Sequence, residues 1–133
     1  MISDGIKGKV GEYAFATEAS SRGLLIGFPA IEAIPYDFFL HTSKGILRIQ
    51  VKSAHTTTEK YSFSLRKKDS TCYTKQDCDY VALWLKDRDA FYIIPVEDLA
   101  IRSLDLYPDK GDSKYEQYRE AWHLLGEPIK DGE

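Results

Sequence analysis

The chain lacks several features that mark particular protein classes. It has no apolar run close to the roughly 20 residues that a membrane helix needs, and its first residues lack the basic and apolar regions of a signal peptide. Its two cysteines, Cys72 and Cys78, are separated by five residues with no second pair, which is poor spacing for zinc. There is no internal repeat. We therefore expect a cytoplasmic protein with incidental thiols and no membrane partner.

The length and composition are ordinary for one compact domain. A chain of 133 residues with 43% hydrophobic and 29% charged residues can bury a core without metal or disulfide staples. Nine Tyr, six Phe and two Trp favour a fold that contains β-strands, or an oligomer. We expect a single domain over residues 1–133, in which residues 126–133 form a frayed tail.

The net charge of −3 is unevenly distributed along the sequence. Residues 1–76 carry 11 basic and 7 acidic residues, whereas residues 77–133 carry 7 basic and 14 acidic residues. The basic half could face a polyanion while the acidic half stays in solvent. A scatter without functional meaning is the alternative, and charge alone does not decide between the two.

The first segment, Asp4 to Arg22, has the hydrophobic spacing of a helix. Asp4 is expected to cap it, and Gly23 stands where a helix end favours a residue with positive φ. Gly8 and Gly11 each weaken the helix by about 1 kcal/mol relative to alanine. They also leave one helix face thin, so a neighbouring segment can approach closely there.

The following segments alternate between strands and turns. A hairpin is expected from strands 36–41 and 46–52, and a second one from strands 80–85 and 91–94. Further strands are expected at 24–26 and 61–65, a short helix at 95–99, and a closing helix at 113–125 with Tyr115, Tyr118, Trp122 and Leu125 on one stripe. This order predicts an α/β domain with one mixed sheet flanked by helices.

The first hairpin gathers three polar side chains on one face. Along its second strand one face is wholly apolar, and the opposite face carries Gln50 and Lys52. If residues 43–44 form the tip, Asp37 lies opposite Gln50; if residues 44–45 form it, Asp37 lies opposite Lys52. In both registers a carboxylate, an amide and an amine share one face.

Such a cluster suits the hydrolysis of phosphodiester bonds. Asp37 can hold Mg²⁺ together with the amide oxygen of Gln50 and the backbone carbonyl of Val51, since Mg²⁺ prefers oxygen ligands. Lys52 can orient or deprotonate the attacking water and stabilise developing negative charge. The alternative from spacing alone is a solvated sheet face with a salt bridge between Asp37 and Lys52.

The motifs resemble those of a known nuclease superfamily. Pro35-Tyr36-Asp37, followed after twelve residues by Gln50-Val51-Lys52-Ser53, resembles the PD-(D/E)XK signature. The helix segment from Gly8 to Phe15 is similar to the first helix of the branch that includes archaeal Holliday-junction resolvases, and Glu12 matches its additional metal-site carboxylate. The resemblance implies a restriction-endonuclease-like core of the α-β-β-β-α-β type that uses Mg²⁺ or Mn²⁺.

The sequence departs from the signature at two positions. Tyr36 separates Pro35 from Asp37, and Gln50 occupies the position that usually holds an acid. Gln in this position resembles the intron-encoded PD-(D/E)XK homing endonucleases, whose catalytic strand reads Gln-x-Lys. That branch implies a site-specific endonuclease for double-stranded DNA, with Asp37, Gln50 and Lys52 as catalytic residues. A Holliday-junction resolvase and a non-catalytic DNA-binding module are the rival readings.

The positions of basic residues indicate which surface would face DNA. The candidates lie on the first helix and beyond the third strand, and they are Lys7, Lys9, Arg66, Lys67, Lys68, Tyr73 and Lys75. A solvated basic loop is the alternative for the second group. Cutting both strands of a duplex needs two active sites, so the resemblance implies a homodimer or homotetramer.

Overall fold

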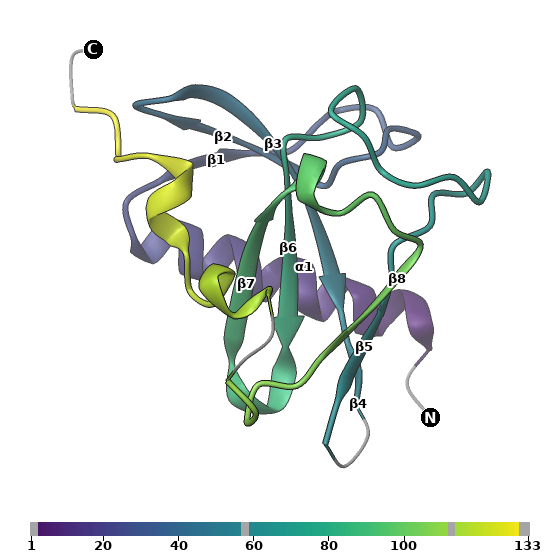
Figure 1. The fold of residues 1–133 in the computed structure, drawn as a ribbon. Helices are drawn as coiled ribbons and strands as arrows, with labels where there is room; N and C mark the ends of the chain where they lie inside the picture. Colours follow the sequence, from purple (N-terminus) through teal and green to yellow (C-terminus); the bar gives the residue numbers. More distant parts are fainter. Residues whose placement is uncertain (1–2, 57–58, 112–113, 131–133) are drawn as a thin grey trace.

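A five-stranded mixed sheet with one long helix across it forms the centre of the molecule (Figure 1). The computed structural model describes residues 3–56, 59–111 and 114–130. The sheet order is β1-β2-β3-β6-β7, in which β3 and β6 are parallel and the other neighbours are antiparallel. The helix and these strands are α1 (Asp4–Ser21), β1 (Leu25–Gly27), β2 (Phe38–Thr42), β3 (Gly45–Ser53), β6 (Tyr80–Leu85) and β7 (Ala90–Pro95).

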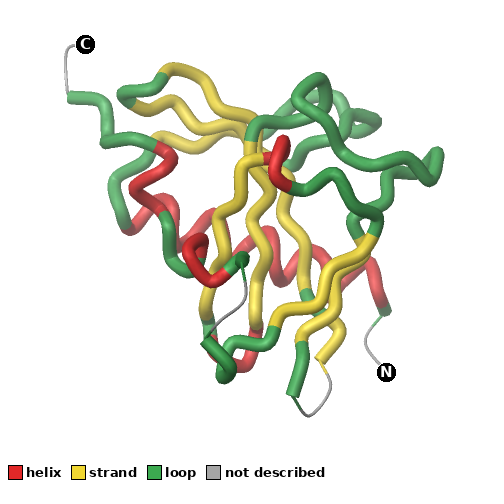
Figure 2. The backbone as a smooth tube through the Cα atoms, in the orientation of Figure 1, coloured by secondary structure: helices red, strands yellow, loops and turns green. Residues whose placement is uncertain are grey.

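A smaller sheet accompanies the large one. Its order is β4-β5-β8, and its strands are β4 (His55–Thr56), β5 (Tyr61–Ser64) and β8 (Ser103–Leu106). The sequence predicted β5 but neither β4 nor β8. The segment between β5 and β6 consists of turns (Figure 2). Within the described residues no helix is both long and apolar enough to cross a bilayer.

Helix α1 lies where the sequence predicted it, with a different N-terminal cap. Ser3 is the capping residue, since its side chain accepts a hydrogen bond from the backbone N–H of Ile6, and Asp4 is the first helical residue. Asp4 still places a negative charge in the first turn, where the helix dipole favours it. Gly23 has φ of +80°, as its position after the helix required.

The large sheet separates two hydrophobic clusters. On the α1 side, Phe15 is fully buried and stacks on Phe38 and Trp122 at centroid distances of 5.7 and 5.4 Å. On the other side, residues of β6 and β7 pack against Tyr61 and Phe63 of the smaller sheet. Burying an aromatic side chain of this size contributes about 1.5–3 kcal/mol. The sheet is therefore covered on both faces.

The predicted closing helix is wrong. Residues 114–125 form two short 3₁₀ turns, Glu116–Tyr118 and Trp122–Leu125, and Glu120 between them has a positive φ of 50°. Tyr115 packs in the cluster beside the smaller sheet, whereas Trp122 packs in the cluster beside α1. One straight helix could not reach both clusters, and the backbone of Glu120 instead donates a hydrogen bond to Phe91 of β7. The predicted short helix near residue 95 is a 3₁₀ turn at Val96–Asp98.

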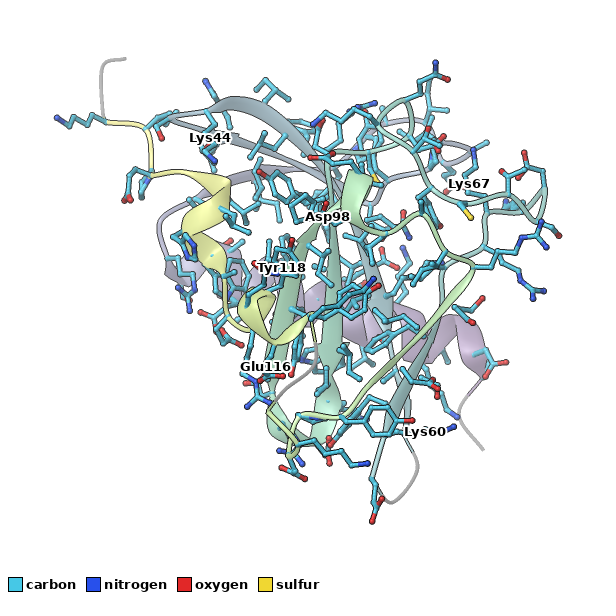
Figure 3. The ribbon with its side chains drawn as sticks, in the orientation of Figure 1. Lys44, Lys60, Lys67, Asp98, Glu116 and Tyr118 are labelled. Atoms are coloured by element: carbon cyan, nitrogen blue, oxygen red, sulfur yellow. The ribbon has the colours of Figure 1, made fainter. Side chains whose placement is uncertain are left out.

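The C-terminal segment is attached further than expected. Residues 126–128 were expected to fray, but Glu127 and Ser43 exchange two hydrogen bonds of 2.8 Å, and Pro128 bridges Thr42. Lys44, at the tip of the hairpin between β2 and β3, donates to the carbonyl of Leu124 (Figure 3). The end of the predicted tail, residues 131–133, lies outside the described residues.

Candidate active site

The register of the hairpin between β2 and β3 fixes the candidate site. Thr42 pairs with Gly45, so Ser43 and Lys44 form a two-residue tip. Phe38 pairs with Ile49, and one step further along the same register Asp37 stands opposite Gln50. Of the two registers that the sequence allowed, the structure has the first. Asp37, Gln50 and Lys52 therefore belong to one face of the sheet.

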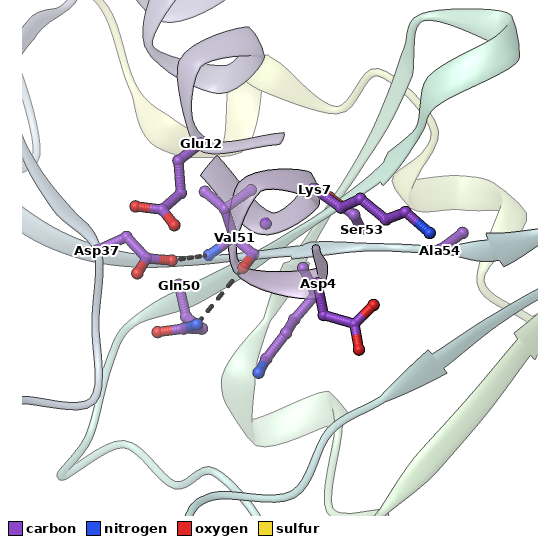
Figure 4. Close-up of a pocket in the computed structure, with 10 residues that line it drawn as sticks. Asp4, Lys7, Glu12, Asp37, Gln50, Val51, Ser53 and Ala54 are labelled. Carbon is purple, nitrogen blue, oxygen red and sulfur yellow. Dashed lines mark hydrogen bonds between the residues drawn. The ribbon is translucent and has the colours of Figure 1, made fainter. Parts of the chain in front are cut away.

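The site lies where β3 extends beyond its neighbour. β2 begins at Phe38, opposite Ile49, whereas β3 continues to Ser53 and leaves an open edge. The carboxylate of Asp37 takes the place of a strand there, because its Oδ2 accepts a hydrogen bond of 2.8 Å from the N–H of Val51 (Figure 4). The carbonyl of Val51 points to the same edge. Gln50 donates to that carbonyl at 3.4 Å.

Helix α1 brings a second carboxylate to this edge. A Cβ atom on Gly11 would lie 2.2 Å from Oγ of Ser53, so the absence of a side chain lets α1 rest directly on the end of β3. Glu12 follows Gly11, and its carboxylate points toward that of Asp37 (Figure 4). The predicted close approach is confirmed at Gly11, whereas a Cβ on Gly8 would meet nothing within 4 Å.

These groups line a cleft of about 620 Å³. The polar residues around it come from α1, from the position before β2 and from the end of β3, and they are Asp4, Lys7, Glu12, Asp37, Gln50, Lys52 and Ser53. All the predicted metal ligands and catalytic residues are thus brought together. Lys9 is not part of the lining; its Nζ lies 3.3 Å from Oε1 of Glu12.

Burial dominates the electrostatics of the cleft. Burial raises the pKa of Asp37 to about 6. The hydrogen bond from the N–H of Val51 lowers this pKa, whereas the negative charge of Glu12 raises it further. Burial also lowers the pKa of Lys52, while Asp37 opposes that shift. A buried carboxylate beside a second acidic side chain forms a site that a cation would stabilise.

The donor set fits a hard divalent cation. Carboxylate oxygens of Asp37 and Glu12, the amide of Gln50 and the carbonyl of Val51 all border the same cleft. A half-turn of the Gln50 amide would exchange its nitrogen for its oxygen, so this side chain can either donate to Val51 or join it as a ligand. Across the described part of the chain no group of three or more His, Cys, Asp or Glu residues could hold a metal. The amide and the backbone carbonyl would therefore have to complete the coordination.

A second cleft, of about 480 Å³, is also lined by Asp37, Gln50 and Lys52. One of its walls is the loop before β2, at residues 32–35, and the other is the segment after β5, which includes Arg66, Lys67 and Lys68. Arg66 and Lys68 are exposed, whereas Lys67 lies 3.0 Å from a carboxylate oxygen of Asp77. Asp37, Gln50 and Lys52 are therefore common to the linings of both clefts.

The remaining predicted DNA contacts are placed differently. Lys75 does not line either cleft; its Nζ lies 3.2 Å from Asp79. Tyr73 lines the second cleft but is only 8% exposed, and its ring lies beneath Lys52.

Sequence reasoning missed one residue that shapes the site. Arg48 of β3 binds the carboxylate of Asp79 and donates to the backbone carbonyls of Lys75 and Gln76 at 2.6 and 2.9 Å. It thereby fixes the segment before β6 against β3. Strand alternation puts Arg48 on the same face as Gln50 and Lys52, but the sequence carries no signal that identifies its partners more than 25 positions away.

Two comparisons with known proteins match most of the chain. Residues 3–125 match the sequence model of the PD-(D/E)XK endonuclease family. Among solved structures, the chain is similar to a bacterial homing endonuclease, I-Ssp6803I, with a TM-score of 0.80 and 25% sequence identity over 94% of this chain and 92% of that chain. No curated protein matches the chain significantly. The expected fold class, a restriction-endonuclease-like α/β core, is confirmed.

Proposed function

Because the chain belongs to the PD-(D/E)XK endonuclease family, we propose that it is a metal-dependent endonuclease that cuts double-stranded DNA at specific sites. The observation that carries this proposal is the convergence of Asp37, Glu12, Gln50 and Lys52 on one cleft at the open edge of β3. Four functional groups that suit phosphodiester hydrolysis thus lie together: two carboxylates, a neutral oxygen donor and an amine.

Each residue has a distinct role in the proposal. Asp37, Glu12, Gln50 and the Val51 carbonyl would hold Mg²⁺ or Mn²⁺, which when bound polarises a phosphoryl oxygen and lowers the pKa of a coordinated water. Lys52 orients the attacking water and faces the negative charge that develops on the phosphate. Asp37 has an additional role, since its hydrogen bond to Val51 holds the carbonyl edge in place.

Two observations support a homing-type enzyme within the family. Gln50 stands where most of the family has an acid, and Gln-x-Lys resembles the catalytic strand of homing endonucleases. The similarity to a bacterial homing endonuclease extends over 94% of this chain rather than over the core alone. The proposed partner is duplex DNA, which would be cut by a homodimer or homotetramer that supplies one active site per strand.

Cleavage of a DNA panel tests this function. The purified protein is incubated with Mg²⁺ or Mn²⁺ and with supercoiled plasmid, a library of random duplex sites and a synthetic four-way junction. Asp37→Ala and Lys52→Ala are assayed beside Lys44→Ala, which removes a lysine from the distant end of the same hairpin. Discrete duplex cuts that persist only in the wild type and Lys44→Ala are expected. Cuts confined to the junction would instead identify a resolvase, and activity that survives all substitutions would refute the site.

The substitution Gln50→Glu tests whether the amide is the working residue. In an active enzyme we expect a loss of cleavage, because a third carboxylate would crowd negative charge beside Asp37 and Glu12. The measurement is the single-turnover rate on the preferred duplex, with Gln50→Ala as the control for loss of the side chain. A gain of activity over an inert wild type would instead support a decayed, non-catalytic DNA-binding module.

A further inference from the structure

Lys52 reaches its position in the cleft without a polar partner. Its side chain is half-buried at the end of β3. Considering residues 3–56, 59–111 and 114–130, no carboxylate oxygen lies within 4.0 Å of its Nζ and no acceptor forms a hydrogen bond with it. Asp37 influences Lys52 through its charge but does not form an ion pair with it. A flexible four-carbon chain would therefore be poorly oriented if polar contacts were its only guide.

The aromatic ring of Tyr73 supplies the contact that the polar groups do not. The Nζ atom of Lys52 lies 5.4 Å from the centroid of this ring, which is within the range of a cation–π interaction. Tyr73 is only 8% exposed and belongs to the hydrophobic cluster beside the smaller sheet. Its hydroxyl has no hydrogen-bond partner in the part of the chain that the structure describes, and its contact with Lys52 is made by the ring.

The segment that carries the ring is hydrogen-bonded to β3. Arg48 fixes residues 75, 76 and 79 to β3 through its guanidinium. Asp77 closes the turn that follows Tyr73 by accepting a hydrogen bond of 2.8 Å from the N–H of Thr74. The segment that carries the ring is thus anchored to the same strand that carries Lys52. A fixed ring and a fixed strand define the direction of the lysine between them.

We propose that Tyr73 is a positioning residue, whose ring face orients the ammonium of Lys52 toward the scissile phosphate in the cleft. This inference rests on the proposed endonuclease function and differs from the role of a DNA contact that the sequence suggested for Tyr73. A DNA contact would be exposed and would act on affinity. A buried platform for the catalytic lysine acts on the rate of cleavage after DNA has bound.

Three variants separate the ring from the rest of the side chain and from general packing. Tyr73→Phe keeps the ring and removes the hydroxyl, and Tyr73→Leu removes the ring while it keeps an apolar side chain. Tyr61→Leu is the matched control, because Tyr61 is a buried tyrosine of the same cluster, lies under the guanidinium of Arg88 and lines neither cleft. Tyr61→Leu also removes a hydroxyl that donates a hydrogen bond to Asp87, so this variant should disturb the packing at least as much as Tyr73→Leu.

The rate of cleavage and the affinity for DNA are measured separately. Affinity is measured with Ca²⁺, and the single-turnover rate is measured after saturating DNA is mixed with Mg²⁺. We expect Tyr73→Leu to lower the rate about ten-fold with an unchanged dissociation constant, since this is the scale of a partly desolvated cation–π interaction. Tyr73→Phe should stay within about three-fold of the wild type, and Tyr61→Leu should keep the wild-type rate.

Several results would overturn the proposal. A Tyr73→Leu defect that lies in the dissociation constant would make Tyr73 a DNA contact. An equal loss of rate in Tyr61→Leu would mean that general packing is responsible, and an equal loss in Tyr73→Phe would assign the effect to the hydroxyl.

A measurement without activity distinguishes this proposal from the proposed function. In protein with ¹³C-labelled lysine, the ε-methylene signal of Lys52, assigned through Lys52→Arg, should be displaced upfield by the ring. The displacement should persist in Tyr73→Phe and vanish in Tyr73→Leu. If the wild type cuts no DNA, the proposed function fails, and the contact is judged by this signal alone. An undisplaced signal in the wild type overturns the inference.

Discussion

Two glycines of α1 offer a paired test of how the helix meets β3. Gly8 and Gly11 stand one turn apart on the same helix, and both have helical backbone. Alanine at Gly8 would meet no atom within 4 Å, whereas alanine at Gly11 would place its Cβ 2.2 Å from Oγ of Ser53 and 3.3 Å from Trp84. The same substitution should therefore have opposite effects at the two positions.

The magnitudes follow from two known contributions. Replacing glycine by alanine in a helix contributes about 0.5–1 kcal/mol of stability at either position. At Gly11 the overpacked Cβ costs about 1–3 kcal/mol in addition, because Ser53 can rotate but the packed ring of Trp84 cannot. The free energies of unfolding of the two variants should therefore differ by about 1–3 kcal/mol. For a chain of 133 residues each kcal/mol shifts the melting temperature by about 4 °C, so Gly8→Ala should melt about 4–12 °C higher than Gly11→Ala.

Thermal unfolding followed by circular dichroism, without metal or DNA, measures this difference. A double variant, Gly11→Ala with Ser53→Ala, should recover part of the loss, because it removes the nearest atom and leaves the Ser53 Cβ at 3.6 Å. Equal melting temperatures for the two single variants would refute the close approach of α1 to β3. Gly11→Ala should also slow DNA cleavage, since a displaced helix moves Glu12 away from Asp37.

Three further predictions concern charge and hydrogen bonding. The pKa of Asp37 is raised to about 6, so its contribution to the stability of the metal-free fold is complete below about pH 4 and is lost as the pH rises through 6. Asp37→Asn should therefore be more stable than the wild type at pH 7 in EDTA, by up to about 3 kcal/mol, and equally stable near pH 4; urea unfolding that shows no difference at pH 7 would contradict this. Arg66→Ala and Lys68→Ala should each reduce the slope of log affinity against log salt by about 1, and Lys75→Ala should reduce it less because Lys75 is paired with Asp79; fluorescence anisotropy on duplex DNA at several salt concentrations measures this, and equal slopes for all three would refute the assignment. Thr42→Val should cost about 1–3 kcal/mol, since it leaves the buried acceptor at Leu125 unpaired, whereas Thr42→Ser should be near neutral in the same unfolding assay.

Local patterns in the sequence were sufficient for the hairpin and its polar face. The alternation of strand residues placed Gln50 and Lys52 together, and the turn residues limited Asp37 to two registers, of which the structure has one. The close approach at Gly11 could also be predicted from the sequence, because it depends on the absence of a side chain at a single residue. These features depend on neighbours in the sequence or on one two-residue turn.

The closing segment and the surroundings of Lys52 could not be predicted in this way. The stripe from Tyr115 to Leu125 has helical spacing, yet its members pack on opposite faces of the sheet and its backbone pairs with β7. The basic residues around Tyr73 in the sequence indicated an exposed aromatic side chain in a basic loop, yet Tyr73 is buried under Lys52. In both cases contacts with distant segments outweighed the local preference.

The sequence by itself therefore determined the family signature, the polar face of β3 and the helix that meets it. The tertiary structure decided how the groups are used, because the properties of a side chain depend on what surrounds it. Asp37 becomes a weaker acid through burial and the nearby Glu12, and Lys52 is directed by a ring from another segment. Desolvation and cation–π contact arise only when segments distant in the chain are packed together.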